Sequence, residues 1–231
     1  MSELLANEGK NLTITVDGAT YARIPIKTKV IGEGDTIPAV AKEFAGEMIE
    51  QDDILFISEK CVACTQKRAI FMKDIHPSFL ARLLCKFVYK SPYGIGLSIP
   101  ETMEMALREC GKLRILWAAL CSAVGKLFGK RGVFYNIAGS KARAIDGPCD
   151  CTLPPYNECV VLGPADPDGV ARDTASALGC KVCIVDLNDL GGVILGVSDE
   201  GMNKEFLFKV LADNPLGQSR QQTPMGIIRK V

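Results

Sequence analysis

The stretch from residue 182 to residue 192 constrains the fold of this chain more than any other part of the sequence. Four apolar residues, 182–185, come first, and they are followed by Asp186, Asn188, Asp189, Gly191 and Gly192. A short apolar run bounded by turn residues is typical of a strand buried inside a sheet. Carboxylate and amide oxygens are ligands that Mg²⁺ and Mn²⁺ prefer, although Asp, Asn and Gly are also ordinary turn residues. The stretch therefore predicts a buried strand that ends in either a metal site or a plain polar turn.

The remainder of the chain mixes strand patterns with helix patterns. Alternation over 12–16, an extended stretch at 21–31 and an apolar run at 54–57 predict further strands. Helical spacing of apolar residues predicts helices at 37–49, 77–89, 101–110, 113–127, 170–178 and 204–212. We expect an α+β (mixed α/β) fold in a single domain, 1–231, with a helical subdomain at about 77–127. The 113–127 run is too short to span a bilayer and is interpreted as a buried helix.

Composition and motifs exclude several classes of protein. Lys plus Arg equals Asp plus Glu, whereas a general nucleic-acid binder would carry a basic excess. No P-loop motif and no G-x-G-x-x-G motif is present, which disfavours the familiar nucleotide-binding folds, Rossmann domains included. The only histidine, His76, is not accompanied by a nucleophile motif such as G-x-S-x-G, which disfavours a histidine-dependent hydrolase. The N-terminal residues lack the long apolar stretch that a secretory signal contains. We expect a soluble cytoplasmic protein with no nucleic-acid partner and no membrane partner.

Ten cysteines are present, and three interpretations of them stay open. The pairs Cys61/Cys64 and Cys180/Cys183 have the C-x-x-C spacing of zinc sites. Both pairs adjoin strand-like runs, however, and residues i and i+3 of a strand point to opposite faces, which suits chelation badly. Cys149 and Cys151 lie in a proline-rich loop, a better place for redox or metal chemistry. Structural zinc, a redox pair and inert reduced thiols are the alternatives.

Three further segments place polar groups beside apolar runs. Residues 58–60 (Ser-Glu-Lys) follow a predicted strand and are either a phosphate contact or a solvated strand end. Residues 141–146 carry two cations and a carboxylate, which suit an anion together with a metal ion, or an ordinary surface loop. Residues 214–224 are rich in amides and hydroxyls and form either a phosphate- or nucleotide-binding loop or a disordered polar loop.

Four segments, in this order along the chain, carry a family resemblance: 54–68 (ILFISEKCVACTQKR), 144–147 (AIDG), 163–169 (GPADPDG) and 185–192. They resemble the coenzyme F-420-0:L-glutamate ligase (gamma-glutamyl ligase) family, over most of the chain from about residue 28 to residue 230. Members of that family join L-glutamate to the carboxylate of a deazaflavin coenzyme precursor and use GTP and two divalent cations. The resemblance also implies a homodimer, K⁺ as a further ion, and a fold that has no P-loop.

The resemblance implies a set of site residues. The ligands of Mg²⁺ or Mn²⁺ would be Asp146, Asp186, Asn188, Asp189 and Gln218. The nucleotide would lie against Thr28, Lys29, Val30, Ile31, Glu59, Lys60, Gly217, Gln218, Ser219 and Arg220. Lys141 and Arg143 would bind substrate, and no catalytic residue is assigned. If the sequence is aligned with the family without a gap, the family's metal-binding pair corresponds to Asn188 and Asp189. If the alignment is shifted slightly, Asp186 takes the first position of that pair.

Departures from the family pattern leave the function open. Cys64 stands where a lysine contacts the nucleotide, and Gln218 and Arg220 replace residues of an acidic loop. Loss of carboxylates weakens cation binding at a triphosphate. One interpretation is a nucleotide- and metal-dependent ligase that forms an amide through an acyl phosphate. The alternative is a non-catalytic protein that binds a metabolite or a partner on the same scaffold. A third is a thiol–metal protein that uses Cys149, Cys151 and a C-x-x-C pair.

Overall fold

Contacts within the chain divide it into two compact units. The computed structural model describes residues 5–88, 95–130, 132–189 and 191–231. The first unit, here called the sheet unit, consists of Met1–Lys67 and Pro164–Val231. The second, the helical unit, is Arg68–Gly163 and includes the whole of the expected helical subdomain, 77–127. The α+β class is confirmed, while the grouping of both units into a single domain stays a prediction.

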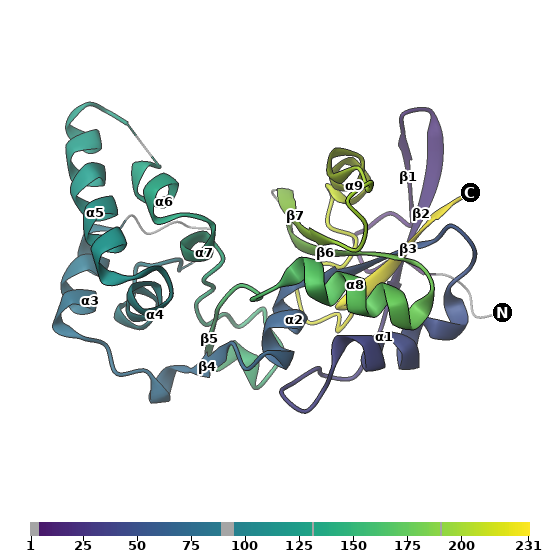
Figure 1. Cartoon of the computed structure of the whole chain (residues 1–231), viewed down its shortest axis with the longest axis horizontal. Helices are drawn as coiled ribbons and strands as arrows, with labels where there is room; N and C mark the ends of the chain where they lie inside the picture. Colours follow the sequence, from purple (N-terminus) through teal and green to yellow (C-terminus); the bar gives the residue numbers. More distant parts are fainter. Residues whose placement is uncertain (1–4, 89–94, 131, 190) are drawn as a thin grey trace. The chain divides into compact units, whose positions relative to one another are not determined.

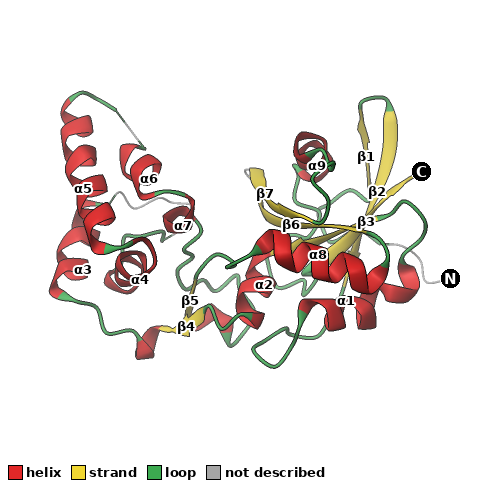
Figure 2. Cartoon of the chain, viewed as in Figure 1, coloured by secondary structure: helices red, strands yellow, loops and turns green. Residues whose placement is uncertain are grey.

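The sheet unit is built on one six-stranded sheet (Figures 1 and 2). Its strands are β1 (Thr13–Val16), β2 (Ala19–Ile26), β3 (Ile54–Ser58), β6 (Lys181–Asn188), β7 (Gly191–Val197) and β8 (Met225–Lys230). They lie in the order β1-β2-β8-β3-β6-β7. Strands β3 and β6 are parallel to each other, and the other neighbouring pairs are antiparallel. The strands predicted at 12–16, 54–57 and 182–185 are confirmed.

Both faces of this sheet are covered by helices. The sheet unit contains α1 (Ile37–Ala45), the 3₁₀ turn η1 (Gly46–Met48), α2 (Glu59–Thr65), α8 (Pro167–Leu178) and α9 (Lys204–Leu211). Leu55 and Ile57 of β3 share one buried cluster with residues of α1 and α8. Phe56, which lies between them, belongs to a second cluster with residues of α9. Since side chains of a strand alternate between faces, burial of all three explains the continuous apolar run at 54–57.

The helical unit packs short helices around a separate core. Its elements are β4 (Ala69–Phe71), η2 (Met72–Asp74), α3 (Phe79–Leu84), η3 (Cys85–Phe87), α4 (Pro100–Cys110), α5 (Lys112–Leu127), α6 (Val133–Ala138), α7 (Ser140–Arg143), η4 (Tyr156–Glu158) and β5 (Cys159–Val161). Met103 of α4 and Ile115 of α5 are fully buried in this core with Val160 of β5. Helices predicted at 77–89, 101–110 and 113–127 are present, although Tyr89 lies outside the described residues. No described helix is both long and apolar enough to cross a membrane.

The prediction that 113–127 is a buried helix is wrong. Only Ile115, Ala118 and Gly125 of α5 are buried, among residues all within the described part of the chain. Trp117 is 59% exposed and Leu127 is 84% exposed. The helix has apolar residues around most of its circumference, and the unit covers one side of it. The apolar content of α5 therefore predicted more burial than the structure has, because the sequence does not show whether other elements cover both sides of the helix.

Most of the polar stretch after Val185 belongs to a strand, and of its described residues only Asp189 lies in a turn. Strand β6 continues to Asn188 and pairs with β7, with Asp186 opposite Val193 and Asn188 opposite Gly191. A Cβ atom on Gly192 would lie 2.3 Å from the backbone oxygen of Asp186, so the close approach of the two strands requires glycine there. The predicted strand is therefore right, but its polar end belongs to the hairpin ladder rather than to a free loop.

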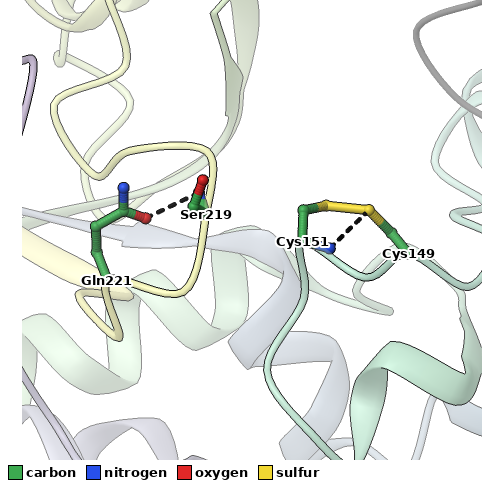
Figure 3. Close-up of a disulfide and its surroundings, with 4 residues drawn as sticks. All are labelled: Cys149, Cys151, Ser219 and Gln221. Atoms are coloured by element: carbon green, nitrogen blue, oxygen red, sulfur yellow. Dashed lines mark hydrogen bonds between the residues drawn. A yellow bond between two sulfur atoms is a disulfide. The ribbon is translucent and has the colours of Figure 1, made fainter.

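The structure bears on two of the cysteine pairs, and it changes the expectation for the first. Cys61 and Cys64 lie on helix α2, where residues i and i+3 share a face, and not on a strand. Both are buried, and burial raises the pKa of the Cys61 thiol well above its ordinary value. Cys149 and Cys151 are joined by a disulfide (Figure 3), and the eight other cysteines, all within the described residues, form none. The Cys149–Cys151 pair is thus oxidised in this structure.

Candidate functional site

The polar segments of the sheet unit gather at one edge of its sheet. Strands β3 and β6 run parallel, so their C-terminal ends lie together. Strand β8 runs antiparallel to both β2 and β3, so its first residue, Met225, pairs with Ile26 at the end of β2 and with Ile57 next to the end of β3. The described segments that adjoin this edge are 27–31, 58–60, 186–189 with 191–192, and 213–224. We call it the polar edge, and it includes every predicted nucleotide-binding residue and four of the five predicted metal ligands.

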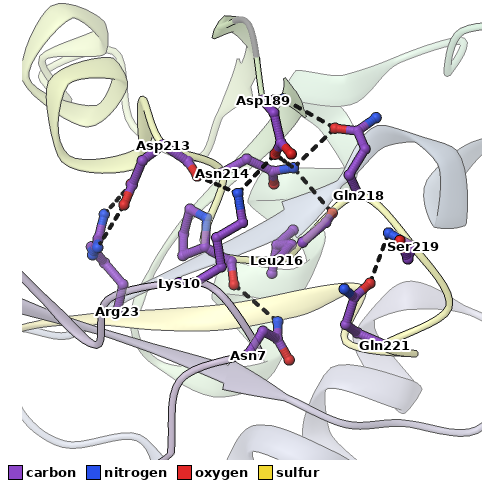
Figure 4. A network of polar contacts seen from close by, with 12 residues as sticks. Asn7, Lys10, Arg23, Asp189, Asp213, Asn214, Leu216, Gln218, Ser219 and Gln221 are labelled. Atoms are coloured by element: carbon purple, nitrogen blue, oxygen red, sulfur yellow. Dashed lines mark hydrogen bonds and ion pairs between the residues drawn. The ribbon is translucent and has the colours of Figure 1, made fainter.

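Backbone hydrogen bonds join these segments to one another. The Thr28 N–H donates to the Gln222 carbonyl (3.1 Å), and Gln222 Nε2 donates back to the Thr28 carbonyl (2.6 Å). The Ser58 N–H donates to the Pro224 carbonyl (2.8 Å). Within the loop, the Ser219 N–H donates to Gln221 Oε1 (2.8 Å; Figures 3 and 4). The loop 213–224 is therefore an ordered part of the polar edge, and the alternative of a disordered polar loop is not what the structure shows.

A lysine from the N-terminal segment joins two segments of the polar edge. Lys10 Nζ lies 2.7 Å from Asp189 Oδ1 and 2.8 Å from the backbone oxygen of Asp213 (Figure 4). The buried Asn214 donates from Nδ2 to Asp189 Oδ1 (3.3 Å) and to Gln218 Oε1 (3.3 Å). Gln218 Oε1 also accepts from the Asp189 N–H (3.0 Å). These contacts tie the tip of the β6–β7 hairpin to the loop 213–224.

This environment sets the charge of Asp189. The hydrogen bond from Lys10 is the largest cause that lowers the pKa of Asp189 below its ordinary range. Partial burial opposes that effect, and the hydrogen bond from Asn214 adds to it. Asp189 is therefore an anion at neutral pH, and its charge is already balanced by the Lys10 ammonium.

Asp189 and Gln218, two of the predicted metal ligands, already use oxygen atoms in hydrogen bonds that would compete with a divalent cation. Asp189 Oδ1 accepts from Lys10 and Asn214, and Gln218 Oε1 accepts from two N–H donors. A carbonyl oxygen has two lone pairs, so both of those on Gln218 are in use. Across the described residues, no three His, Cys, Asp or Glu side chains form a group that could hold a metal ion. Asp186 and Asn188 are half-buried and share a face of β6.

The other predicted site residues belong to the helical unit. The backbone of Asp146 pairs with that of Val161, with N–O distances of 2.8 and 2.9 Å. Lys141 Nζ lies 3.5 Å from Glu109 Oε1, and Arg143 Nη2 donates to Asn136 Oδ1 (2.5 Å). Both predicted substrate-binding cations therefore have partners within their own unit. A metal ion shared between Asp146 and the polar edge stays a prediction.

Glu109 is the anion at the centre of the helical unit's polar contacts. It also accepts from Arg68 Nη2 (2.8 Å). Burial raises the pKa of Glu109, but the hydrogen bond and charge of Arg68 and the nearby Lys141 outweigh it and leave the pKa lowered. The unit also has a cavity of about 400 Å³, with Lys73, Asp150, Asn157 and Glu158 among its lining residues. None of the predicted site residues lines that cavity.

Sequence reasoning missed the residues that organise the polar edge. Lys10 carried no signal, because a single lysine near the N-terminus is usually solvated. Arg23 offered one: it is a charged residue in a strand pattern, and the structure buries it to 1% exposure. It is paired with both carboxylate oxygens of Asp213 (Figure 4), and it donates to the Val210 carbonyl (3.0 Å). A charged residue in a strand pattern is thus the signal in the sequence, because a buried arginine requires an anionic partner such as Asp213.

Comparison with known proteins finds one family. The family model described as F420-0:Gamma-glutamyl ligase matches residues 25–187, which is more than two thirds of the chain. The match includes the segments 54–68, 144–147 and 163–169, and among the predicted metal ligands it includes Asp146 and Asp186. It ends before Asn188, so Asp189 and Gln218 lie outside it. No curated protein sequence matches the chain.

Proposed function

Because the chain belongs to the F420-0:gamma-glutamyl ligase family, we propose that it joins L-glutamate to the carboxylate of coenzyme F-420-0 or a related acceptor. Family membership supports a ligase that acts on small molecules. The nucleotide, the acyl phosphate, the cation requirement, a homodimer and a cytoplasmic location are further parts of the proposal. The single observation that carries it is the polar edge, where four separate segments from the sheet unit converge.

The reaction we propose has two steps. The γ-phosphoryl group of GTP is transferred to the acceptor carboxylate, which gives an acyl phosphate and GDP. The amine of L-glutamate then attacks the acyl carbon, inorganic phosphate leaves, and the amine loses a proton as the amide forms. Such chemistry depends mainly on the position of the reactants and on stabilisation of the phosphate charge.

The residues of the polar edge suit the nucleotide step. Ligands of open sheets bind beyond the carboxyl ends of the strands, and β3 and β6 both end here. Lys29, Lys60 and Arg220 supply positive charge at this edge, which favours a triphosphate. Lys29 Nζ lies 2.7 Å from Asp35 Oδ1, and this hydrogen bond is the largest cause that raises the pKa of Lys29. Gly217 has φ +81°, a backbone conformation that favours glycine.

Mg²⁺, Mn²⁺ and K⁺ enter the proposal only through the family. Since Asp189 and Gln218 are already satisfied by Lys10 and Asn214, no step of the proposed reaction is routed through a metal ion at those residues. The work of this chain's own residues is to bind the phosphates and to hold the acceptor and the amine together.

The proposal is tested with the purified chain, GTP, L-glutamate and coenzyme F-420-0. We expect a product heavier by one glutamyl residue, with release of GDP and phosphate in equal amounts, measured by mass spectrometry and a phosphate assay. Lys60→Ala removes a charge from the polar edge and should lower kcat/KM by about 10²-fold. Lys181→Ala is the matched control, because Lys181 is exposed at the opposite end of β6. Equal effects of the two substitutions, or no amide product, contradict the proposal.

A non-catalytic binding protein is the second candidate. Two substitutions favour this candidate: Cys64 and Gln218 replace a lysine and an acidic residue of the family pattern. The ion pair between Lys10 and Asp189 also favours it. Calorimetric titration with GTP and with coenzyme F-420-0 separates the two functions. Binding with no turnover across a panel of amino acids and carboxylate acceptors would establish the second candidate.

A further inference from the structure

Helix α5 of the helical unit presents an apolar stripe to solvent. Its exposed apolar residues are Leu113, Leu116, Trp117, Leu120, Val124 and Leu127, and the following Phe128 is exposed as well. These residues recur every three or four positions, so they lie along one side of the helix. The buried residues of α5, among them Ile115 and Ala118, lie on the opposite side. The helix therefore has two apolar sides, and the structure covers only one.

Further exposed apolar residues lie on a second segment of the helical unit. Phe79 and Leu83 of α3 and Phe87 of η3 are also exposed, Phe79 to 81%. Lys126 Nζ of α5 donates to the Phe87 carbonyl (3.0 Å), which places η3 against the last turn of α5. We call these ten residues the apolar face: Phe79, Leu83, Phe87, Leu113, Leu116, Trp117, Leu120, Val124, Leu127 and Phe128. The α5 residues lie side by side along the helix, and a contiguous exposed apolar patch is typical of an interaction site.

The two stretches of sequence that carry the apolar face contain charges of one sign only. Residues 75–100 and 110–145 contain no Asp or Glu, although the chain as a whole has as many acidic as basic residues. The described basic residues next to the face in sequence are Arg82, Lys86, Lys112, Arg114, Lys126 and Lys130. Helix α4 lies between the two stretches, and two of its acids are paired inside the unit, Glu104 with Ser78 and Arg108, and Glu109 with Arg68. Basic charge is thus concentrated in the two stretches that carry the apolar face.

Two kinds of occupant suit an apolar stripe on a helix, and the charges distinguish them. Leu113, Trp117, Leu120, Val124 and Leu127 follow the alternating four- and three-residue spacing of a helix-pairing seam. A second copy of this chain, however, would bring the same basic residues together with no acid in either stretch to pair with them. An anionic lipid surface satisfies both properties, since aromatic and leucine side chains enter the interface while Lys and Arg contact lipid phosphates.

We propose that the apolar face binds the surface of a membrane containing anionic phospholipids. Exposed Trp117 and Phe79 are the side chains best suited to the boundary between headgroups and acyl chains. Association through one short apolar face and a few cations is reversible and weakens with salt. This proposal departs from the expectation of no membrane partner, and it goes beyond the proposed ligase activity.

The experiment uses the full chain and vesicles of phosphatidylcholine with or without phosphatidylglycerol. Trp117 is the only tryptophan, so its fluorescence reports directly on the apolar face. We expect a blue shift and co-sedimentation with the phosphatidylglycerol vesicles, little of either with phosphatidylcholine alone, and reversal by high salt. Leu127→Glu should weaken binding roughly tenfold or more, since it removes an apolar contact and adds a negative charge. Leu5→Glu changes another exposed leucine, one that belongs to the sheet unit; it is the matched control and should bind as the parent does.

Three outcomes overturn the proposal. The first is no blue shift and no co-sedimentation with the anionic vesicles. The second is vesicle binding that Leu127→Glu leaves unchanged, which would place the lipid contact elsewhere. The third is a concentration-dependent dimer in analytical ultracentrifugation that Leu127→Glu abolishes, without vesicle binding, which would show that a second copy covers the face.

Discussion

At the scale of single residues, the defining feature is an ammonium group where the family resemblance predicts a metal ion. Lys10 contacts a carboxylate oxygen of Asp189 and a backbone carbonyl, as a bound cation would. An ammonium offers three donors and one positive charge, which satisfy these acceptors without a divalent ion. The side chain of Lys10 is 15% exposed, whereas that of Asp189 is 53% exposed, so solvent screens the pair in part.

Lys10→Met tests the role of this ammonium. We expect the free energy of unfolding to fall by about 1 kcal/mol, because Asp189 and the Asp213 carbonyl lose a charged donor in a partly exposed place. The variant should also gain a Mn²⁺-dependent rise in melting temperature that the parent lacks. Both quantities are measurable by urea denaturation and by thermal unfolding with and without Mn²⁺.

The control is Lys42→Met, which removes an exposed lysine from α1. It should leave both the stability and the response to Mn²⁺ unchanged. A parent protein that is already stabilised by Mn²⁺, with the effect lost in Asp189→Asn, would show that the metal displaces Lys10.

The same pair predicts a pH dependence. The folded-state pKa of Asp189 lies below its unfolded value of about 3.9. Its contribution to stability is therefore complete above the unfolded pKa and is lost as the pH falls through the folded pKa. Stability of the parent should fall more steeply than that of Asp189→Asn over this acidic range, measured by urea denaturation at successive pH values. Identical acid profiles of the two proteins would contradict it.

At the scale of elements, close packing of the central strands limits what the sheet tolerates. Gly226 of β8 pairs with Pro25 of β2 on one side and Phe56 of β3 on the other. A Cβ atom on Gly226 would lie 2.6 Å from Phe56 Cζ and 2.8 Å from the Ile24 backbone oxygen. A ring in a packed core and a backbone oxygen have little room to move, so this position admits no side chain.

Gly226→Ala should therefore destabilise the sheet unit. We expect a loss of about 1–3 kcal/mol, the usual cost of inserting a methyl group into a filled core. Chemical denaturation followed by circular dichroism measures it. Gly34→Ala is the control, because a Cβ atom there meets no atom within 4 Å, and its effect should stay within about 0.5 kcal/mol. A neutral Gly226→Ala would show that β8 shifts to accept the methyl group.

At the scale of the whole molecule, each buried cluster draws its residues from one unit. Two clusters, one on each face of the sheet, contain residues of the sheet unit alone. The third cluster contains residues of the helical unit alone. A substitution in one cluster should therefore act first on its own unit, since neighbours in one packed cluster lose the contacts directly.

Two matched substitutions test this expectation. Ile57→Ala and Ile115→Ala each truncate a fully buried isoleucine, one in each unit. Each should lower the free energy of unfolding by about 2–5 kcal/mol. Amide hydrogen exchange should accelerate in β3, β6 and β8 for Ile57→Ala, and in α4 and α5 for Ile115→Ala. Equal acceleration across both units by either substitution would mean that the two units unfold together.

The sequence determined the elements and the family of this protein. Helical periodicity located α1, α4 and α9, and the apolar runs at 54–57 and 182–185 located the central strands, because a regular element records its buried positions in its own period. The ordered motifs identified the ligase family, which the family match confirms. They also named the segments of the polar edge, since polar side chains after a buried strand are visible locally.

Only the tertiary structure decided how those segments are completed and which apolar surfaces are covered. Lys10 and Asp189 lie 179 positions apart, so no local pattern could pair them. The two apolar sides of α5 look alike in sequence, and the layer that covers one of them comes from other elements of the helical unit. Periodicity reports what a residue's own element requires, whereas contacts between distant segments follow from the topology that brings the elements together.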